Sequence, residues 1–488
     1  MAEDKLTGKK VASGLLWAFA ERIGAQTVSF VISILLARML LPKEYGVVSL
    51  VMVFINLANV FISNGLGESL VQKQDADEVD FSSIFYCGLT ISVVLYAVLF
   101  CSAPTIADFY DNEMLRPVLR VLALVLPITA VNSVQNAYVS RNMIFKKFFV
   151  STLAGTIGSG VIGVIMAFTG FGPWALVAQY CSNALFRTIS LFVVLPWRPR
   201  LLFSWARAKG LLRYGSRIMG AEFINSGYSQ LRSLIIGKVY SSEQLAYYQK
   251  GNSFPSLVIT NINTAVSKVL FPSMTKLNHD PEQLKQFTRK SMRLTSYVIF
   301  PLMAGLIAVA EPMILFLLTE KWIQAVKLLQ ILCLYWIFQP VLTANWQVIK
   351  ARGRSDLCLK LELLKKGVGV VLVIGSMYIS VEALAWSNVL LAGFSVLVNM
   401  FPCRKLIGYT MLEQTMDLLP AISLSLVMCI VTHLLGWLAM PVLPVFAVLV
   451  LQVVVGAGIY IGLSALLRVE CFRDCMNILS GYRKRSKE

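Results

Sequence analysis

The stretch "GLLWAFAERIGAQTVSFVISILLARML", residues 14–40, decides the fold class, because a run this apolar is long enough to cross a membrane as a helix. The rest of the chain has the same character. Of its 488 residues, 57% are hydrophobic and 14% are charged, and the mean hydropathy is +0.69. A soluble globular domain carries about 25% charged residues. The composition therefore indicates an integral membrane protein.

Apolar segments of about 20 residues recur along the whole chain. The first half has them at 11–36, 46–66, 81–104, 118–140, 148–170 and 172–196, and the second half at 211–237, 246–272, 294–318, 326–349, 360–380, 382–402, 418–440 and 442–467. Unbroken runs of this kind exclude the alternating pattern of a β-barrel. The first run is longer than the apolar part of a signal peptide, so we count it as a span. We expect an all-α integral membrane protein with about 14 transmembrane helices.

The placement of the basic residues predicts the topology. The formal net charge is +18, and nearly all loop Lys and Arg lie in alternate loops: the N-terminal segment, 141–147, 197–213, 275–293, 350–360 and the C-terminal tail. Cytoplasmic loops carry such an excess, so both termini are expected in the cytoplasm. The charge therefore reflects topology, and we expect no nucleic-acid partner because no basic patch is interleaved with aromatic residues.

The sequence offers little for catalysis or for a cofactor. It has no phosphate-binding loop of the G-x-x-x-x-G-K-[ST] type, and its nine Cys and two His show no metal-ligand spacing. We therefore expect no catalytic residue, metal site or cofactor. A driving force, where one acts, would be an ion or substrate gradient.

Charged and polar residues form stripes on the first and seventh spans. Arg22 and Gln26 share one face of the first span, with Glu21 beside it; the seventh carries Arg217, Glu222, Asn225 and Arg232. The two stripes align at a shift of 196 residues, and residues 36–46 align with 236–246 at a shift of 200, which suggests an internal repeat. An intramembrane cation is costly without an anion or water, so the three arginines favour a cationic cavity. Glu21 and Glu222 are candidates for ion coupling, or they pair with Arg22 and Arg217.

Amide side chains lie on the faces of several other spans. With Asn225 of the seventh span they comprise Asn56, Asn59, Asn132, Gln135, Asn136, Asn252, Asn263 and Asn345. Amides bind the hydroxyl groups of sugars well, which makes these residues candidates for a substrate cavity. The alternative is that they form hydrogen bonds between helices and contact no substrate.

Four stretches, residues 35–72, 141–179, 235–274 and 320–332, resemble bacterial polysaccharide exporters of the O-antigen and colanic acid flippase type. The first contains "LLARMLLPKEYG" and the last reads "EKWIQAVKLLQIL". This family belongs to the superfamily of the MATE drug exporters and the lipid II flippase. The resemblance covers about residues 10–350, and the colanic acid branch is most similar.

The resemblance implies two six-helix lobes in a V around a central cavity, followed by two additional helices. The expected parts are residues 1–200, 201–410 and 411–488. It also implies a function: flipping an undecaprenyl-pyrophosphate-linked oligosaccharide, such as a colanic acid or O-antigen repeat unit, from the cytoplasmic to the periplasmic leaflet of the bacterial inner membrane by alternating access. The pyrophosphate would suit Arg22, Arg217 and Arg232, since Arg offers a planar fork of donors.

Two positions depart from the family pattern, and three other functions remain open. Members often carry Asp where this chain has Arg232-Ser233, and Gly where it has Thr319. The alternatives are a MATE-like ion-coupled exporter of small molecules, a membrane polymerase or ligase, and a scaffold of the polysaccharide machinery. Expected partners are the lipid-linked oligosaccharide, membrane lipids and the polymerase or export machinery.

Overall fold

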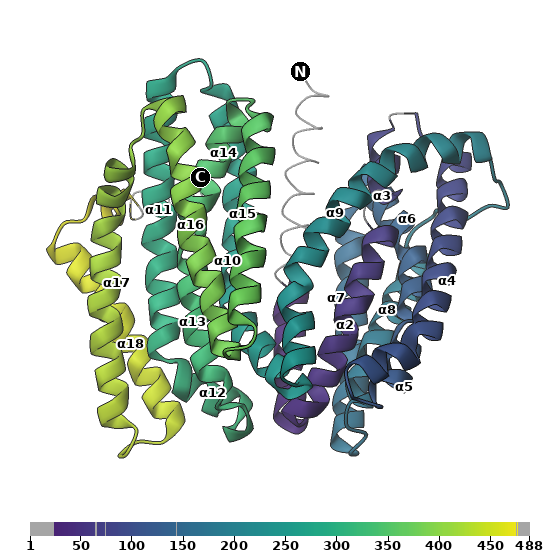
Figure 1. Cartoon of the computed structure of the whole chain (residues 1–488), viewed down its shortest axis with the longest axis horizontal. Helices are drawn as coiled ribbons and strands as arrows, with labels where there is room; N and C mark the ends of the chain where they lie inside the picture. Colours follow the sequence, from purple (N-terminus) through teal and green to yellow (C-terminus); the bar gives the residue numbers. More distant parts are fainter. Residues whose placement is uncertain (1–23, 64–65, 74, 143, 475, 477–488) are drawn as a thin grey trace, which may run out of the picture. The chain divides into compact units, whose positions relative to one another are not determined.

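The computed structural model describes residues 24–63, 66–73, 75–142, 144–474 and 476, without the side chains of 145–147. Every regular element of this part is a helix, which confirms the all-α class (Figure 1). The chain divides into two compact units, unit 1 up to Ala246 and unit 2 from Tyr247 onward. The expected lobe boundary at 200/201 stays a prediction.

Unit 1 contains eight labelled helices among its described residues, together with a helix at Gly24–Met39. They are α2 (Pro42–Ser63), α3 (Leu66–Gln72), α4 (Glu78–Phe109), α5 (Leu115–Leu122), α6 (Val125–Asn142), α7 (Phe145–Phe168), α8 (Trp174–Val194) and α9 (Trp205–Val239). The next helix, α10 (Ser242–Lys276), crosses the unit boundary.

Unit 2 continues with eight α-helices and one short 3-10 helix. They are α11 (Pro281–Ala308), α12 (Ala310–Leu318), η1 (Glu320–Trp322), α13 (Ala325–Ile337), α14 (Gln339–Ala351), α15 (Ser355–Ser376), α16 (Val381–Ile407), α17 (Met411–Ala439) and α18 (Val445–Leu466). Among these, α11 packs along α17, and α17 packs along α18 (Figure 1).

Nine helical segments within the described residues are long and apolar enough to cross a membrane. The expected number of about 14 stays a prediction. The first expected span begins before the described residues, and α8, α9, α10 and α15 are long enough but more polar than the nine. Polar residues inside a long helix of a membrane protein point to function, so these four helices are of particular interest.

The core of unit 1 brings α9 against the earlier helices. Leu211 and Met219 of α9 are buried with Leu66, Phe81 and Trp197, and α9 packs against α2, α3 and α4. Close packing of such large side chains stabilises helix contacts inside a membrane through many small dispersion contacts. One side of α9 is therefore fixed to the body of unit 1.

Helix boundaries in the structure agree with the internal repeat. The helix at Gly24–Met39 ends 200 residues before Val239, the last residue of α9, and α2 begins 200 residues before α10. The first turns after these breaks meet closely, because a Cβ at Gly46 would lie 1.7 Å from the backbone oxygen of Ser242. Only glycine fits at that position.

In unit 2, a break between α11 and α12 is closed by two glutamines. Pro312 has no N–H to donate to the carbonyl of Ala308, four residues earlier. Gln330 Nε2 donates to the carbonyl of Ile307 at 3.2 Å, and Gln452 Nε2 lies 3.4 Å from that of Ala308. The side chains of two neighbouring helices thus replace the backbone bonds that the break removes.

Candidate functional site

The candidate residues of the sequence fall on several helices of both units. Arg22 and Glu21 lie outside the described residues. Gln26 lies on the helix at Gly24–Met39; Asn56 and Asn59 on α2; Asn132, Gln135 and Asn136 on α6; Arg217, Glu222, Asn225 and Arg232 on α9; Asn252 and Asn263 on α10; and Asn345 on α14.

Arg217 lies on the side of α9 that unit 1 leaves open. Gly215 and Met219 are buried, so a residue midway between them points away from the core, and Arg217 is exposed. A Cβ at Gly220 would meet no heavy atom within 4 Å among the described residues. On this side of α9, the guanidinium of Arg217 therefore lies next to Gly220, where the helix backbone has no side chain to cover it.

Arg232 lies farther along α9 and in a different environment. It is only 6% exposed, one turn before Ile236 on the side that packs against α2. Fifteen residues of helix separate it from Arg217, which is about 22 Å along the axis. One pyrophosphate cannot contact both arginines at the same time.

A pocket of about 440 Å³, with several polar residues in its lining, lies between the end of α2, α3 and α6. Three serine hydroxyls, the amides of Gln72 and Asn136 and the carboxylate of Glu68 line it. Asn136 is the candidate residue of the sequence that this pocket includes. Apart from Glu68, the polar side chains of this lining are uncharged hydrogen-bond donors and acceptors. Such a lining suits a ligand that is rich in hydroxyl groups.

Arg187 of α8 forms a hydrogen bond with Asn136 and does not itself line the pocket. It was not among the residues predicted from the sequence. Its Nη2 donates to Asn136 Oδ1 at 3.3 Å, and its guanidinium lies 5.0 Å from the centre of the Phe148 ring. The signal was available, because Arg187 is a cation inside the expected span 172–196.

The other two amide residues of the same α6 face are buried. Gln135 is 0% exposed and Asn132 is 4% exposed. Neither amide atom of Gln135, nor Asn132 Oδ1, has a hydrogen-bond partner among the described residues. Each unsatisfied buried group costs about 1 to 3 kcal/mol. The buried amides of Gln135 and Asn132 therefore lower the free energy of unfolding of unit 1.

Several candidate amides bond to neighbouring helices. Thr129 Oγ1 donates to Asn59 Oδ1 at 3.1 Å, Trp336 Nε1 donates to Asn252 Oδ1 at 2.9 Å, and Asn345 Nδ2 donates to Gln414 Oε1 at 2.9 Å. Asn345 is fully buried, whereas Asn56 is exposed. The role of these residues in a substrate cavity stays a prediction.

Outside the spans, an ion pair joins the start of α9 to the turn before α4. Arg207 Nη1 donates to Asp77 Oδ2, and the same carboxylate accepts from the backbone N–H groups of Val79 and Asp80 as the N-cap of α4. The bond from Arg207, followed by these backbone bonds, lowers the pKa of Asp77 to about 2. No three His, Cys, Asp or Glu residues in the described ranges lie close enough together to hold a metal ion.

Comparison with known proteins gives a consistent family. Residues 35–327 match the family described as "Polysaccharide biosynthesis protein". The chain is 30% identical over 329 residues, 67% of each chain, to the succinoglycan biosynthesis transport protein ExoT of Rhizobium meliloti (strain 1021). It is 22% identical, over 88% of each chain, to the lipopolysaccharide biosynthesis protein WzxC of Escherichia coli (strain K12).

Solved structures share the fold at low sequence identity. The lipid II flippase MurJ in an inward closed conformation superposes with a TM-score of 0.73 at 15% identity, covering 95% of this chain and all of that one. An inward-facing multidrug resistance MATE transporter gives a TM-score of 0.60 at 14% identity, over 78% of this chain and 95% of that one. The fold is therefore the one these transporters share.

Proposed function

The chain belongs to the polysaccharide biosynthesis protein family, and we propose that it flips a polyprenyl-pyrophosphate-linked oligosaccharide from the cytoplasmic to the periplasmic leaflet by alternating access. The substrate in this proposal is the repeat unit of an exopolysaccharide, such as colanic acid, or of an O-antigen. The membrane is the bacterial inner membrane, with both termini in the cytoplasm. The observation that carries the proposal is the open, cationic side of α9.

The depth of Arg217 suits a lipid-linked pyrophosphate. A hydrocarbon core about 30 Å thick takes about 20 residues of helix. Counted back from Val239, the end of α9, this length stops close to Arg217. With the expected topology, Arg217 lies at the level of the inner-leaflet headgroups, where a pyrophosphate would first meet the protein. Its planar fork of donors matches phosphate oxygens.

The pocket lined by Asn136 supplies complementary chemistry for the sugar. It lies at the end of unit 1 where α3 ends and α4 begins, which the expected topology places in the cytoplasm. Serine hydroxyls and amides offer both donors and acceptors to sugar hydroxyls. In this proposal Arg187 orients Asn136 and does not itself contact the sugar.

The MATE-like alternative takes less support from these residues. For an exporter of cationic small molecules, an exposed Arg217 would repel the substrate. The fold similarity to a multidrug transporter carries no information on substrate at 14% identity. A polymerase, a ligase and a scaffold are tested by the same experiment as the flippase.

The proposal is tested by transport in sealed vesicles. The purified chain is reconstituted with a fluorescent undecaprenyl-pyrophosphate oligosaccharide, and the label reaching the far leaflet is followed over time. We expect protein-dependent transfer, reduced at least tenfold by Arg217→Ala, because a lost charge-assisted contact to phosphate is worth about 1.5 to 3 kcal/mol. The matched control is Lys209→Ala, which removes an exposed cation two turns earlier on α9 and should transfer as the wild type does.

Other outcomes of this transport assay would favour the alternative functions. Wild-type protein that is folded but moves no label, even with a proton or sodium gradient, would contradict the flippase and favour a scaffold or an enzyme. Transfer of an organic cation in place of the oligosaccharide would favour the MATE-like exporter.

A further inference from the structure

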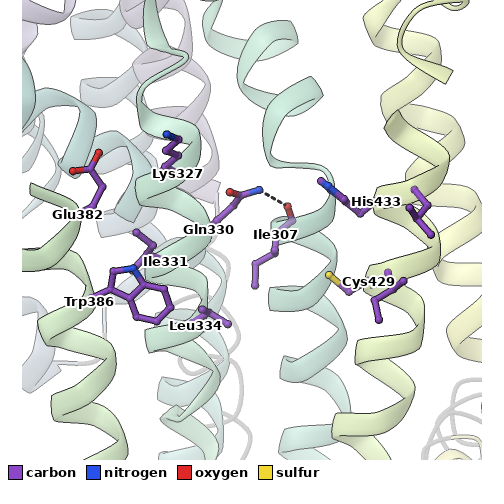
Figure 2. A pocket seen from close by; sticks show the side chains of 11 residues that line it. Ile307, Lys327, Gln330, Ile331, Leu334, Glu382, Trp386, Cys429 and His433 are labelled. Carbon is purple, nitrogen blue, oxygen red and sulfur yellow. Dashed lines mark hydrogen bonds between the residues drawn. The ribbon is translucent and has the colours of Figure 1, made fainter. Parts of the chain in front are cut away.

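A groove of about 630 Å³ opens in unit 2 among α11, α13, α16 and α17, away from every residue assigned above. Figure 2 shows Lys327 and Glu382 at one end of the groove and Leu334 at the other. The volume falls in the range of small-molecule sites, about 300 to 1,000 Å³. A groove of this size between membrane helices accommodates a ligand of the size of a lipid chain.

The walls of the groove are apolar and open to the surroundings. Trp386, Ile430 and Leu434 line it and are 45%, 51% and 53% exposed. Exposed apolar side chains on spanning helices face lipid, and an aromatic residue near the end of a helix is typical of the membrane interface. The polar group on the floor, Gln330, is already bonded to the carbonyl of Ile307 (Figure 2). The walls therefore suit an acyl chain.

Charged and polar side chains gather at one end of the groove. Lys327 lies in the first turn of α13, Glu382 in the first turn of α16, and His433 in the last two turns of α17. From Lys327 to Leu334 the groove extends seven residues along α13, which is about 10 Å. It is thus amphipathic along its length, with charges at the membrane surface and apolar side chains deeper.

The two opposite charges do not neutralise each other. Among the described residues, neither Lys327 nor Glu382 has an ion-pair partner, although both line the same groove. At the start of α17, by contrast, Glu413 is paired with Lys285 at 2.9 Å. A separated ammonium and carboxylate match a ligand that carries a phosphate and an ammonium.

We propose that this groove binds a zwitterionic phospholipid with a primary amine, phosphatidylethanolamine, from the leaflet at this end of unit 2. Its phosphate meets Lys327, its ammonium meets Glu382, and one acyl chain lies along Leu334 and Trp386. A primary ammonium offers three donors to a carboxylate, whereas the quaternary ammonium of phosphatidylcholine offers none. A lipid with an anionic headgroup would meet the carboxylate of Glu382 unfavourably.

The headgroup preference is measured on the purified full chain in detergent. Phosphatidylethanolamine, phosphatidylglycerol and phosphatidylcholine with identical acyl chains are titrated and followed by native mass spectrometry. We expect phosphatidylethanolamine to bind roughly threefold or more tightly than the other two, which is the size of one partly exposed charge pair. Glu382→Gln should reverse the order in favour of phosphatidylglycerol, and Lys327→Gln should weaken all three lipids.

Matched controls lie in η1, close by in the chain. Glu320→Gln and Lys321→Gln remove the same two charges from exposed positions that do not line the groove, and both variants should bind as the wild type does. Each variant is first shown to keep its melting temperature in detergent without added lipid. The proposal is overturned by equal affinities for the three lipids, by an unchanged order in Glu382→Gln, or by tighter binding of undecaprenyl phosphate than of phosphatidylethanolamine.

The position of the acyl chain has an independent readout. Phosphatidylethanolamine with brominated chains quenches nearby tryptophans, and we expect the quenched fraction to fall in Trp386→Phe. Equal quenching in the wild type and in Trp386→Phe would place the chain elsewhere and overturn the assignment.

Discussion

Gln414 in unit 2 and Gln135 in unit 1 are the same residue in opposite situations. Both are 0% exposed on a long helix. Gln414 uses both ends of its amide, accepting from Asn345 Nδ2 and donating to the carbonyl of Tyr409 at 3.2 Å. Gln135 uses neither end within the described part of the chain. Burial alone therefore does not say whether an intramembrane amide holds the fold together.

The difference extends beyond this pair of residues. In unit 2 the amides of Gln330 and Gln452 also donate to backbone carbonyls, at the break between α11 and α12. In unit 1 the buried amides of α6 lie next to the pocket lined by Asn136 and have fewer bonds. Local rules of structure are broken most often at functional sites. We infer that these three glutamines of unit 2 serve packing and that the buried amides of α6 in unit 1 are kept for a ligand.

The largest effect is expected when the satisfied amide is removed. Gln414→Leu leaves Asn345 Nδ2 and the carbonyl of Tyr409 buried without a partner, so the free energy of unfolding should fall by about 2 to 5 kcal/mol. The measurement is thermal unfolding in detergent. An unchanged melting temperature would remove the distinction between the two glutamines.

A slightly smaller effect is expected at Gly436, which makes room for another bonded glutamine. A Cβ there would lie 1.9 Å from Gln452 Nε2, which donates to the carbonyl of Thr432 at 3.0 Å. Gly436→Ala should therefore destabilise the protein by about 1 to 3 kcal/mol. Gly458→Ala on α18, where a Cβ would meet no described atom within 4 Å, is the control and should unfold as the wild type does.

Thr319 of unit 2 lies in the turn between α12 and η1. Its φ of 82° and ψ of 172° fall in a region that is essentially restricted to glycine, and its buried hydroxyl has no partner among the described residues. Thr319→Gly should raise the stability by about 1 kcal/mol after the entropy cost of glycine. A lower melting temperature of this variant would show that the turn needs its side chain.

The smallest effect concerns a carboxylate of unit 1 that is paired outside the membrane. Because the folded state lowers the pKa of Asp77 to about 2, from an ordinary value of about 3.9, its ion pair stabilises the protein above about pH 4 and is lost as the pH falls toward 2. Asp77→Asn keeps an N-cap residue but not the charge. The melting temperature of the wild type should exceed that of this variant at pH 5, and the difference should disappear by pH 2.5. A constant difference in melting temperature across that range would contradict the assignment.

Much of the fold follows from the apolar runs of the sequence, since each expected span corresponds to a helix or a pair of helices in the described residues, apart from the start of the first. Helical periodicity also placed Asn132, Gln135 and Asn136 on one face of α6. It could not say which helix meets that face. For this reason the sequence did not separate Asn345, which is bonded to Gln414, from Asn136, which lines a pocket.

Two cations within expected spans were not predicted as functional residues, although the same reasoning identified the arginines of the first and seventh spans. Arg187 in α8 and Lys365 in α15 are cations inside expected spans. Lys365 pairs with Glu362 at 3.0 Å and lies over the Trp346 ring, so its charge is compensated within α14 and α15. The break at Pro312 was also missed, because the bonds that close it come from residues far away in the sequence.

The most direct test of the account combines stability and transport in one variant, Gln135→Leu. We expect a melting temperature that is unchanged or higher, because an unsatisfied buried amide that costs about 1 to 3 kcal/mol is removed. We also expect at least a tenfold loss of oligosaccharide flipping in sealed vesicles. Stable protein that flips at the wild-type rate would contradict the claim that unit 1 keeps the buried amides of α6 for the substrate.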